Sequence, residues 1–143
     1  MKKTPEGWPR ISSALFYDDA AKAIAWLCKA FDFEVRLLIE GEGGRIEHSE
    51  LTFGDGLIMI ASTNPQYEGP TAHRTHCEAA DAWLGSPYVV DGALVYVDDI
   101  DAHYARAVSA GAPTLSSVES GGPARLYRTE DLEGHRWMFM QRG

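Results

Sequence analysis

The amino-acid sequence predicts an α+β fold made of two tandem β-α-β-β-β modules. The main observation is an internal repeat, in which the segment LFYDDAAKAI at 15–24 returns 80 residues later as VYVDDIDAHY at 95–104. Each copy joins a short apolar segment, an Asp-Asp pair and the start of an amphipathic stretch. A second observation is that the apolar period changes from helical to alternating after each copy. One such module cannot cover both faces of its sheet, so we expect the modules to pair with each other or with a second chain.

The first module is predicted at about 10–62. Its first strand precedes Asp18-Asp19, and a helix follows, because apolar residues recur there at positions i, i+3, i+4 and i+7. This stripe consists of Ala20, Ala23, Ile24, Leu27, Ala30 and Phe31. The aspartates fit the N-cap, where a carboxylate oxygen accepts a bond from a free helical amide. A second strand is expected at 34–38, and segments 48–53 and 57–60 form a hairpin around Gly-Asp-Gly.

The second module, at about 90–142, repeats this order. Its helix is expected from Ile100 to Gly111, where glycine with Pro113 behind it ends a helix. Segment 114–118 is the expected counterpart of the second strand, and 125–129 with 135–140 forms the final hairpin. The stretch at about 63–89, which contains Pro65, Pro70 and Pro87, is expected to be a linker within one domain of residues 1–143.

Composition excludes several classes of protein. The 143 residues are 45% hydrophobic and 24% charged, which is typical of a globular protein rather than a disordered one. The net charge of −8 argues against binding to nucleic acid or to anionic membranes, because both need clustered cations. No apolar run approaches the ~20 residues that cross a bilayer. Cys28 and Cys77 form no CxxC pair and no signal peptide precedes them, so we expect reduced thiols in a cytoplasmic protein.

These segments resemble the vicinal oxygen chelate superfamily, which contains glyoxalases, bleomycin-resistance proteins, fosfomycin-resistance proteins and extradiol dioxygenases. The resemblance covers nearly the whole chain and rests on FYDDAAKAIAW at 16–26 with FDF behind it, on VDDIDAHY at 97–104 and on DLEGH at 131–135. Asp32 and Leu132 depart from it, because relatives usually carry glycine and proline there. The resemblance implies cup-shaped mixed sheets with helices on the convex face, and commonly a homodimer that combines four modules.

Metalloenzymes of this superfamily carry His, Gln or Glu ligands on the first and last strand of each module. Alignment with them places these four positions at Ser12, Met59, Gly92 and Met138. None is a usual ligand for a divalent ion that prefers imidazole or carboxylate. We therefore expect neither a metal nor another cofactor at these positions, and interpret them as ligand-contacting.

Four further residues are candidates for a ligand site. His48 and Glu50 share one face of a strand, where Glu50 is a candidate general base or partner of a cationic ligand and His48 would tune it. The alternative is a structural hydrogen-bonded pair or an exposed rim, and we favour it over catalysis. Arg128 either binds a carboxylate or pairs with an acid of the protein. Trp83 either stacks on a planar ligand or anchors a dimer contact.

The remaining cluster, His73, His76 and Cys77, has the form HxxHC, but neither a fourth zinc ligand nor a rigid frame is evident. The leading hypothesis is a bleomycin-resistance-like protein that sequesters a cationic or aromatic small molecule, such as an antibiotic, without metal. Catalysis is left open, and a non-enzyme is favoured. The alternative is a divalent-metal-dependent lyase, isomerase or dioxygenase, and a third possibility is a regulatory or structural dimer.

Overall fold

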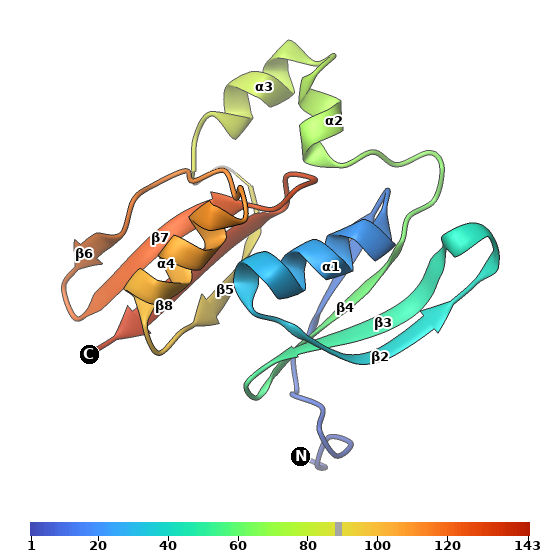
Figure 1. Ribbon diagram of the computed structural model, residues 1–143, viewed down its shortest axis with the longest axis horizontal. Helices are drawn as coiled ribbons and strands as arrows, with labels where there is room; N and C mark the ends of the chain where they lie inside the picture. Colours follow the sequence, from blue (N-terminus) through green and yellow to red (C-terminus); the bar gives the residue numbers. More distant parts are fainter. Residues whose placement is uncertain (88–89) are drawn as a thin grey trace. The chain divides into compact units, whose positions relative to one another are not determined.

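The computed structural model describes residues 1–87 and 90–143, which form two compact units, Met1–Tyr67 and Glu68–Gly143 (Figure 1). Each unit contains a four-stranded mixed sheet with a helix packed on one face. This arrangement confirms the α+β fold of two β-α-β-β-β modules. The stretch expected as a linker at 63–89 contributes to both units, and its last two residues, 88 and 89, lie outside the described residues.

The first unit follows the predicted order of elements. These are β1 (Ser13–Tyr17), α1 (Ala20–Phe31), β2 (Glu34–Glu40), the 3-10 turn η1 (Glu42–Gly44), β3 (Ile46–Phe53) and β4 (Gly56–Ser62). The strand order is β1-β4-β3-β2, in which β1 runs parallel to β4 and the other neighbours are antiparallel. The six residues of the predicted apolar stripe are all buried, so α1 packs as expected. Asp19 caps α1 by accepting a 3.0 Å bond from the Lys22 amide.

The second unit repeats this topology with additional helices. Its elements are α2 (Pro70–Arg74), α3 (Glu78–Leu84), β5 (Gly92–Tyr96), α4 (Ile100–Ser109), β6 (Glu119–Gly121), β7 (Ala124–Glu130) and β8 (Arg136–Arg142). The strand order β5-β8-β7-β6 matches that of the first unit, with β5 parallel to β8. Asp99 caps α4 through the Ala102 amide, as Asp19 caps α1. The repeated Asp-Asp pair therefore marks the same strand-to-helix turn in both units.

Aromatic side chains form the core between α4 and its sheet. The rings of Tyr127 and Phe139 stack with their centroids 5.3 Å apart, and Trp137 is 2% exposed. The Tyr127 hydroxyl lies 2.7 Å from Nδ1 of buried His103, which satisfies both polar groups. The Trp137 indole donates to Oδ2 of Asp131 at 3.0 Å, a bond that holds the turn before β8. His103 is thus a packing residue on α4.

Two expectations about local structure are wrong. Segment 114–118 is not a strand, because the amides of Leu115 and Ser116 both donate to the Arg128 carbonyl, a geometry that regular pairing does not allow. Thr114 makes only an isolated bridge to Thr129, and the paired strand β6 starts later. The stretch at 63–89 is not an irregular linker throughout, since it contains the helices α2 and α3. Pro70 occupies the start of α2, where its missing amide costs nothing.

Candidate functional site

The second unit brings three predicted ligand-binding residues together on one sheet. Met138 on β8 pairs with Leu94 on β5 and with Arg128 on β7, so these side chains form one row across three strands. Gly92 lies two residues before Leu94 and therefore on the same face. This face is opposite to the one that carries buried Phe139 and Tyr127. Leu94 is 45% exposed, so the row is open to a ligand.

A pocket of about 210 Å³ lies over this row. Its lining is Pro87, Val90, Gly92, Ala93, Leu94, Leu115, Arg128, Arg136, Trp137 and Met138. The walls are apolar, and among the lining residues that the structure describes only the two arginines have ionisable side chains. Met138 contributes a flexible thioether wall that adapts to ligand shape.

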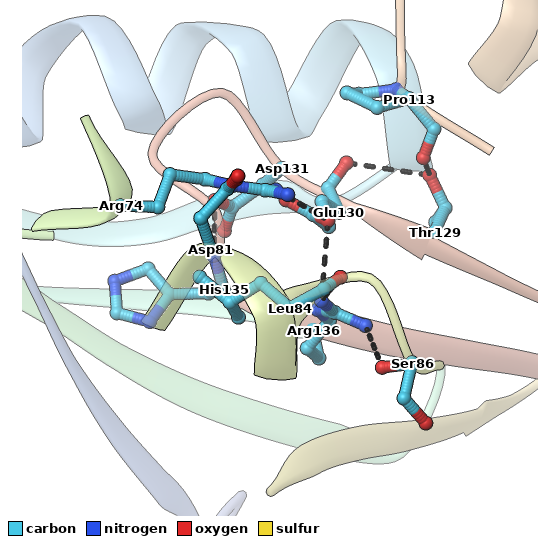
Figure 2. Close-up of polar contacts among 10 residues, drawn as sticks. All are labelled: Arg74, Asp81, Leu84, Ser86, Pro113, Thr129, Glu130, Asp131, His135 and Arg136. Atoms are coloured by element: carbon cyan, nitrogen blue, oxygen red, sulfur yellow. Dashed lines mark hydrogen bonds and ion pairs between the residues drawn. The ribbon is translucent and has the colours of Figure 1, made fainter. Parts of the chain in front are cut away.

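Arg136 was missed by sequence reasoning and is the most buried polar residue of the pocket, at 6% exposed. Its Nη1 donates to the Ser86 carbonyl at 3.0 Å and its Nη2 to the Leu84 carbonyl at 2.6 Å, as Figure 2 shows for Ser86. The guanidinium thereby satisfies carbonyl groups at the C-terminal end of α3, where a cation is favourable. Its Nε is buried and has no hydrogen-bond partner among the described residues.

An acid neutralises Arg136. Oε1 of Glu130 lies 3.4 Å from Nη2 of Arg136 and 3.8 Å from Nη1 of Arg74 (Figure 2). The Nε of Arg74 also donates a hydrogen bond to Asp81 on α3. Burial raises the pKa of Glu130, and the two arginines oppose that rise. Burial likewise lowers the pKa of Arg136, against the effect of Glu130. This ionic cluster ties α3 to the strands β7 and β8 beside the pocket.

The first unit places Glu50 and Met59 side by side, since β3 and β4 pair these two residues directly. Glu50 is 6% exposed, and both of its oxygens are occupied. Nε of Arg36 lies 3.1 Å from one oxygen and Nε2 of His48 lies 3.2 Å from the other. His48 and Glu50 thus form a hydrogen-bonded pair, and Arg36 adds a cationic partner to it. A cationic ligand at Glu50 would have to compete with Arg36.

Arg36 was not predicted because the pairing of β2 with β3 is interrupted at this residue, between Val35 and Leu37. A bulge redirects a side chain in a way that strict alternation does not anticipate. Arg36 also stacks over the Trp8 ring at 5.5 Å and donates to the Gly7 carbonyl at 2.5 Å. Ser12, the remaining candidate of this unit, has a buried hydroxyl without a hydrogen-bond partner among the described residues.

The residues at the superfamily's metal-ligand positions do not fit a divalent ion. A Cβ at Gly92 would lie 2.8 Å from the Arg136 carbonyl oxygen, so the backbone approach there excludes a ligating side chain. On the first strand of each unit, Met138 is paired with Leu94 and Met59 with Ala14. On its other side Met59 is paired with Glu50, whose two oxygens already contact Arg36 and His48. Thioether and alkyl groups are poor ligands for metals that bind imidazole and carboxylate. We derive no chemistry through a metal at these positions.

The other candidates lie away from the pocket. Trp83 on α3 is 60% exposed and does not belong to the pocket lining. His73 and His76 converge on Glu68 rather than on Cys77. None of the helices in the described ranges has the length and apolar character that a membrane crossing requires.

The chain belongs to the glyoxalase/bleomycin resistance protein/dioxygenase superfamily, whose sequence model matches residues 10–139. It is 29% identical over 134 residues to the uncharacterized protein Mb0911c of Mycobacterium bovis, an alignment that covers 93% of this chain and 83% of the relative.

Solved structures share the fold. TioX from Micromonospora sp. ML1 is 27% identical, with a TM-score of 0.69 over 94% of this chain and 97% of that one. TnmS3 from Streptomyces sp. CB03234, described as an antibiotic binding protein, is 17% identical, with a TM-score of 0.64 over 92% and 93%. The fosfomycin resistance protein FosX of Listeria monocytogenes, solved as a mutant with Mn(II), is 14% identical, with a TM-score of 0.59 over 90% and 85%. At these identities, the similarity to TnmS3 and to FosX shows a shared fold only.

Proposed function

We propose that the chain is a small-molecule binding protein that sequesters its ligand without a metal, in the pocket of the second unit. The observation that carries this proposal is the lining itself, in which Leu94 and Met138 form an apolar wall beside Arg128. Apolar walls with a few placed polar groups are typical of ligand sites. The description of TnmS3 as an antibiotic binding protein supports this class of function for the fold.

The ligand we propose is a small planar aromatic molecule with an anionic or hydrogen-bond-accepting group. A pocket of about 210 Å³ is smaller than the ~300–1,000 Å³ that drug-sized ligands occupy, which favours two fused rings over a large antibiotic. Arg128 on the row of Met138 offers a guanidinium, whose fork matches a carboxylate. The cationic ligand of the leading hypothesis does not suit this pocket, since the ionisable side chains among its described lining residues are arginines.

Binding is favoured over catalysis because of the chemistry of these side chains. Arginine stays protonated under ordinary conditions and does not act as a general acid or base. The pair Glu50–His48 in the first unit is the alternative centre for a divalent-metal-dependent lyase, isomerase or dioxygenase. Its carboxylate already binds Arg36, so it offers a metal no free oxygen.

Matched probes test the proposal. Calorimetric titration of EDTA-treated protein should show saturable binding of 2-naphthoate and much weaker binding of 2-naphthylmethylamine, which has the same rings and the opposite charge. Leu94→Arg should abolish binding by filling the pocket. Val35→Arg is the control, because Val35 is equally exposed, at 46% against 45%, and lies outside the pocket. Equal binding of both probes, or binding that survives Leu94→Arg, would refute this ligand class and site.

Arg128 is tested with a control on the same strand. Arg128→Met should weaken 2-naphthoate binding by about tenfold, because a charge-assisted hydrogen bond contributes a free energy of about that factor in the dissociation constant. Arg125→Met should leave binding unchanged, because Arg125 forms a bidentate pair with Asp101 at 2.8 Å on the side of α4. An unchanged affinity in Arg128→Met would remove Arg128 from the site.

We also propose a homodimer as the working form. Apolar side chains remain exposed on the strands of both units, including Phe16 at 51% and Tyr96 at 55%. Exposed apolar surface of this kind marks association sites. Light scattering after size-exclusion chromatography should give twice the mass of the chain, and a monomer at micromolar concentration would overturn the proposal.

A further inference from the structure

We propose that Glu68, His73 and His76 form a binding site for a divalent transition-metal ion on the surface of the second unit. All three residues belong to this unit, and they surround the short helix α2 rather than the sheet. The site is therefore separate from the superfamily's metal-ligand positions on the strands. It is also separate from the proposed ligand pocket, whose lining includes none of the three.

The side chains already converge on a common point. Nδ1 of His73 lies 2.8 Å from Oε1 of Glu68, and Nε2 of His76 lies 2.5 Å from the same oxygen. The three potential ligand atoms lie within 4.8 Å of one another. The two imidazole rings are 5.2 Å apart and nearly perpendicular, so both direct a nitrogen at the carboxylate without clashing.

A defined backbone holds this arrangement. In α2 the His73 amide donates to the Gly69 carbonyl at 3.0 Å, and in the turn after α2 the His76 amide donates to the His73 carbonyl at 3.3 Å. The three-residue spacing places both imidazoles on one side of the helical turn. The Thr71 amide donates to the Glu133 carbonyl at 3.1 Å, which anchors α2 to the turn between β7 and β8. The sequence did not predict α2 or its hydrogen bond to Glu133.

The ligand set suits zinc-like ions. Imidazole and carboxylate are common Zn²⁺ ligands, with bonds of about 2.0–2.2 Å, so tetrahedral ligand atoms lie roughly 3.3 Å apart. The present separations of 2.8 and 2.5 Å widen to that value by small rotations of side chains that are 40–58% exposed. The ion would take the place of the protons that the imidazoles share with Glu68. Water would fill the fourth position, and Mg²⁺ or Ca²⁺ would bind poorly because they prefer all-oxygen sites.

Glu68 replaces the ligand that the sequence pattern suggested. In the motif HxxHC, Cys77 is the neighbour in sequence, but it stands before α3 as the N-cap residue and is not part of the metal-competent group found among the described residues. The carboxylate instead comes from the segment before α2. The hydrogen bond with His73 is the main reason that the pKa of Glu68 is lowered.

Titration of Zn²⁺ into the EDTA-treated full chain tests the site. The wild type should bind one equivalent, and the affinity should fall at least about tenfold in His73→Ala, in His76→Ala and in Glu68→Gln. Cys77→Ser is the matched control and should bind as the wild type does. With Co²⁺ as the probe, the visible spectrum should lack a sulfur-to-cobalt charge-transfer band.

Two results would overturn the proposal. One is equal Zn²⁺ binding by the wild type and by His73→Ala/His76→Ala, which would place any bound ion elsewhere. The other is loss of binding in Cys77→Ser, or a cobalt–thiolate band, which would give the ligand role to the cysteine. Circular dichroism of each variant should show that it is folded, because the substituted side chains are not buried. Failure to bind 2-naphthoate has no bearing on this outcome, because the two sites share no residue.

Discussion

Arg136→Met tests the buried ionic cluster that joins α3 to the pocket. The substitution removes the partner 3.4 Å from Glu130 and the donors to the Leu84 and Ser86 carbonyls. Loss of one member of a buried ion pair costs about 3–5 kcal/mol, because the other charge stays buried without compensation. Arg74 still lies 3.8 Å from the same Glu130 oxygen, so we expect about 3 kcal/mol, at the low end.

The loss should depend on pH with a definite sign. Burial already raises the pKa of Glu130 above its ordinary value of 4.5, and removal of Arg136 raises it further. An acid whose pKa is higher in the folded state destabilises the fold at high pH, and that cost disappears as pH falls through the folded-state pKa. The destabilisation by Arg136→Met should therefore be largest at pH 7–8 and shrink toward about pH 5.

Urea unfolding of the wild type and the variant at several pH values provides the measurement. The double variant Glu130→Gln/Arg136→Met is the control, since it removes the stranded charge and should recover about 1–2 kcal/mol of the loss. A loss below about 1 kcal/mol, a loss that does not vary with pH, or a double variant no more stable than Arg136→Met would refute the reasoning.

Three further substitutions test the packing of the second unit. Gly134→Ala should destabilise the protein by about 2–3 kcal/mol, because φ is +91° there and the new Cβ would lie 2.8 Å from the Thr71 amide nitrogen. Gly111→Ala, with φ of +88° and no atom within 4 Å, should cost only about 1 kcal/mol, and equal melting temperatures for the two variants would contradict the close approach. Tyr127→Phe should cost about 1–2 kcal/mol by removing the buried hydrogen bond between the Tyr127 hydroxyl and His103, and an unchanged urea midpoint would show that this bond contributes nothing.

The fold was predictable from sequence because its determinants are local. The repeated Asp-Asp pair caps α1 and α4 through the amides of Lys22 and Ala102, and apolar periodicity identified the buried face of α1. Asp32, noted as replacing glycine, has φ of 67° and ends α1 in the left-handed conformation that glycine usually supplies. Each of these features depends on residues within a few positions of one another.

The candidate site was predictable only in part, because its polar groups depend on long-range geometry. Arg136 bonds carbonyls 50 and 52 residues before it, and Arg36 reaches Glu50 through a bulge. Glu68 joins His73 and His76 across five and eight residues around α2, a contact that no helical or strand period predicts. Met138 was a candidate from the resemblance to the superfamily and Arg128 from its side-chain chemistry, but the register of β7 with β8 that places them in one row depends on pairing between strands.

Methyl NMR of EDTA-treated protein titrated with 2-naphthoate tests metal-free ligand binding most directly. We predict saturable shifts of the Leu94, Leu115 and Met138 methyl groups without added metal, since these side chains line the pocket. Methyl groups of the first unit, such as that of Met59, should not move. Absence of shifts until a divalent metal is added, or shifts confined to the first unit, would contradict a metal-free site in this pocket.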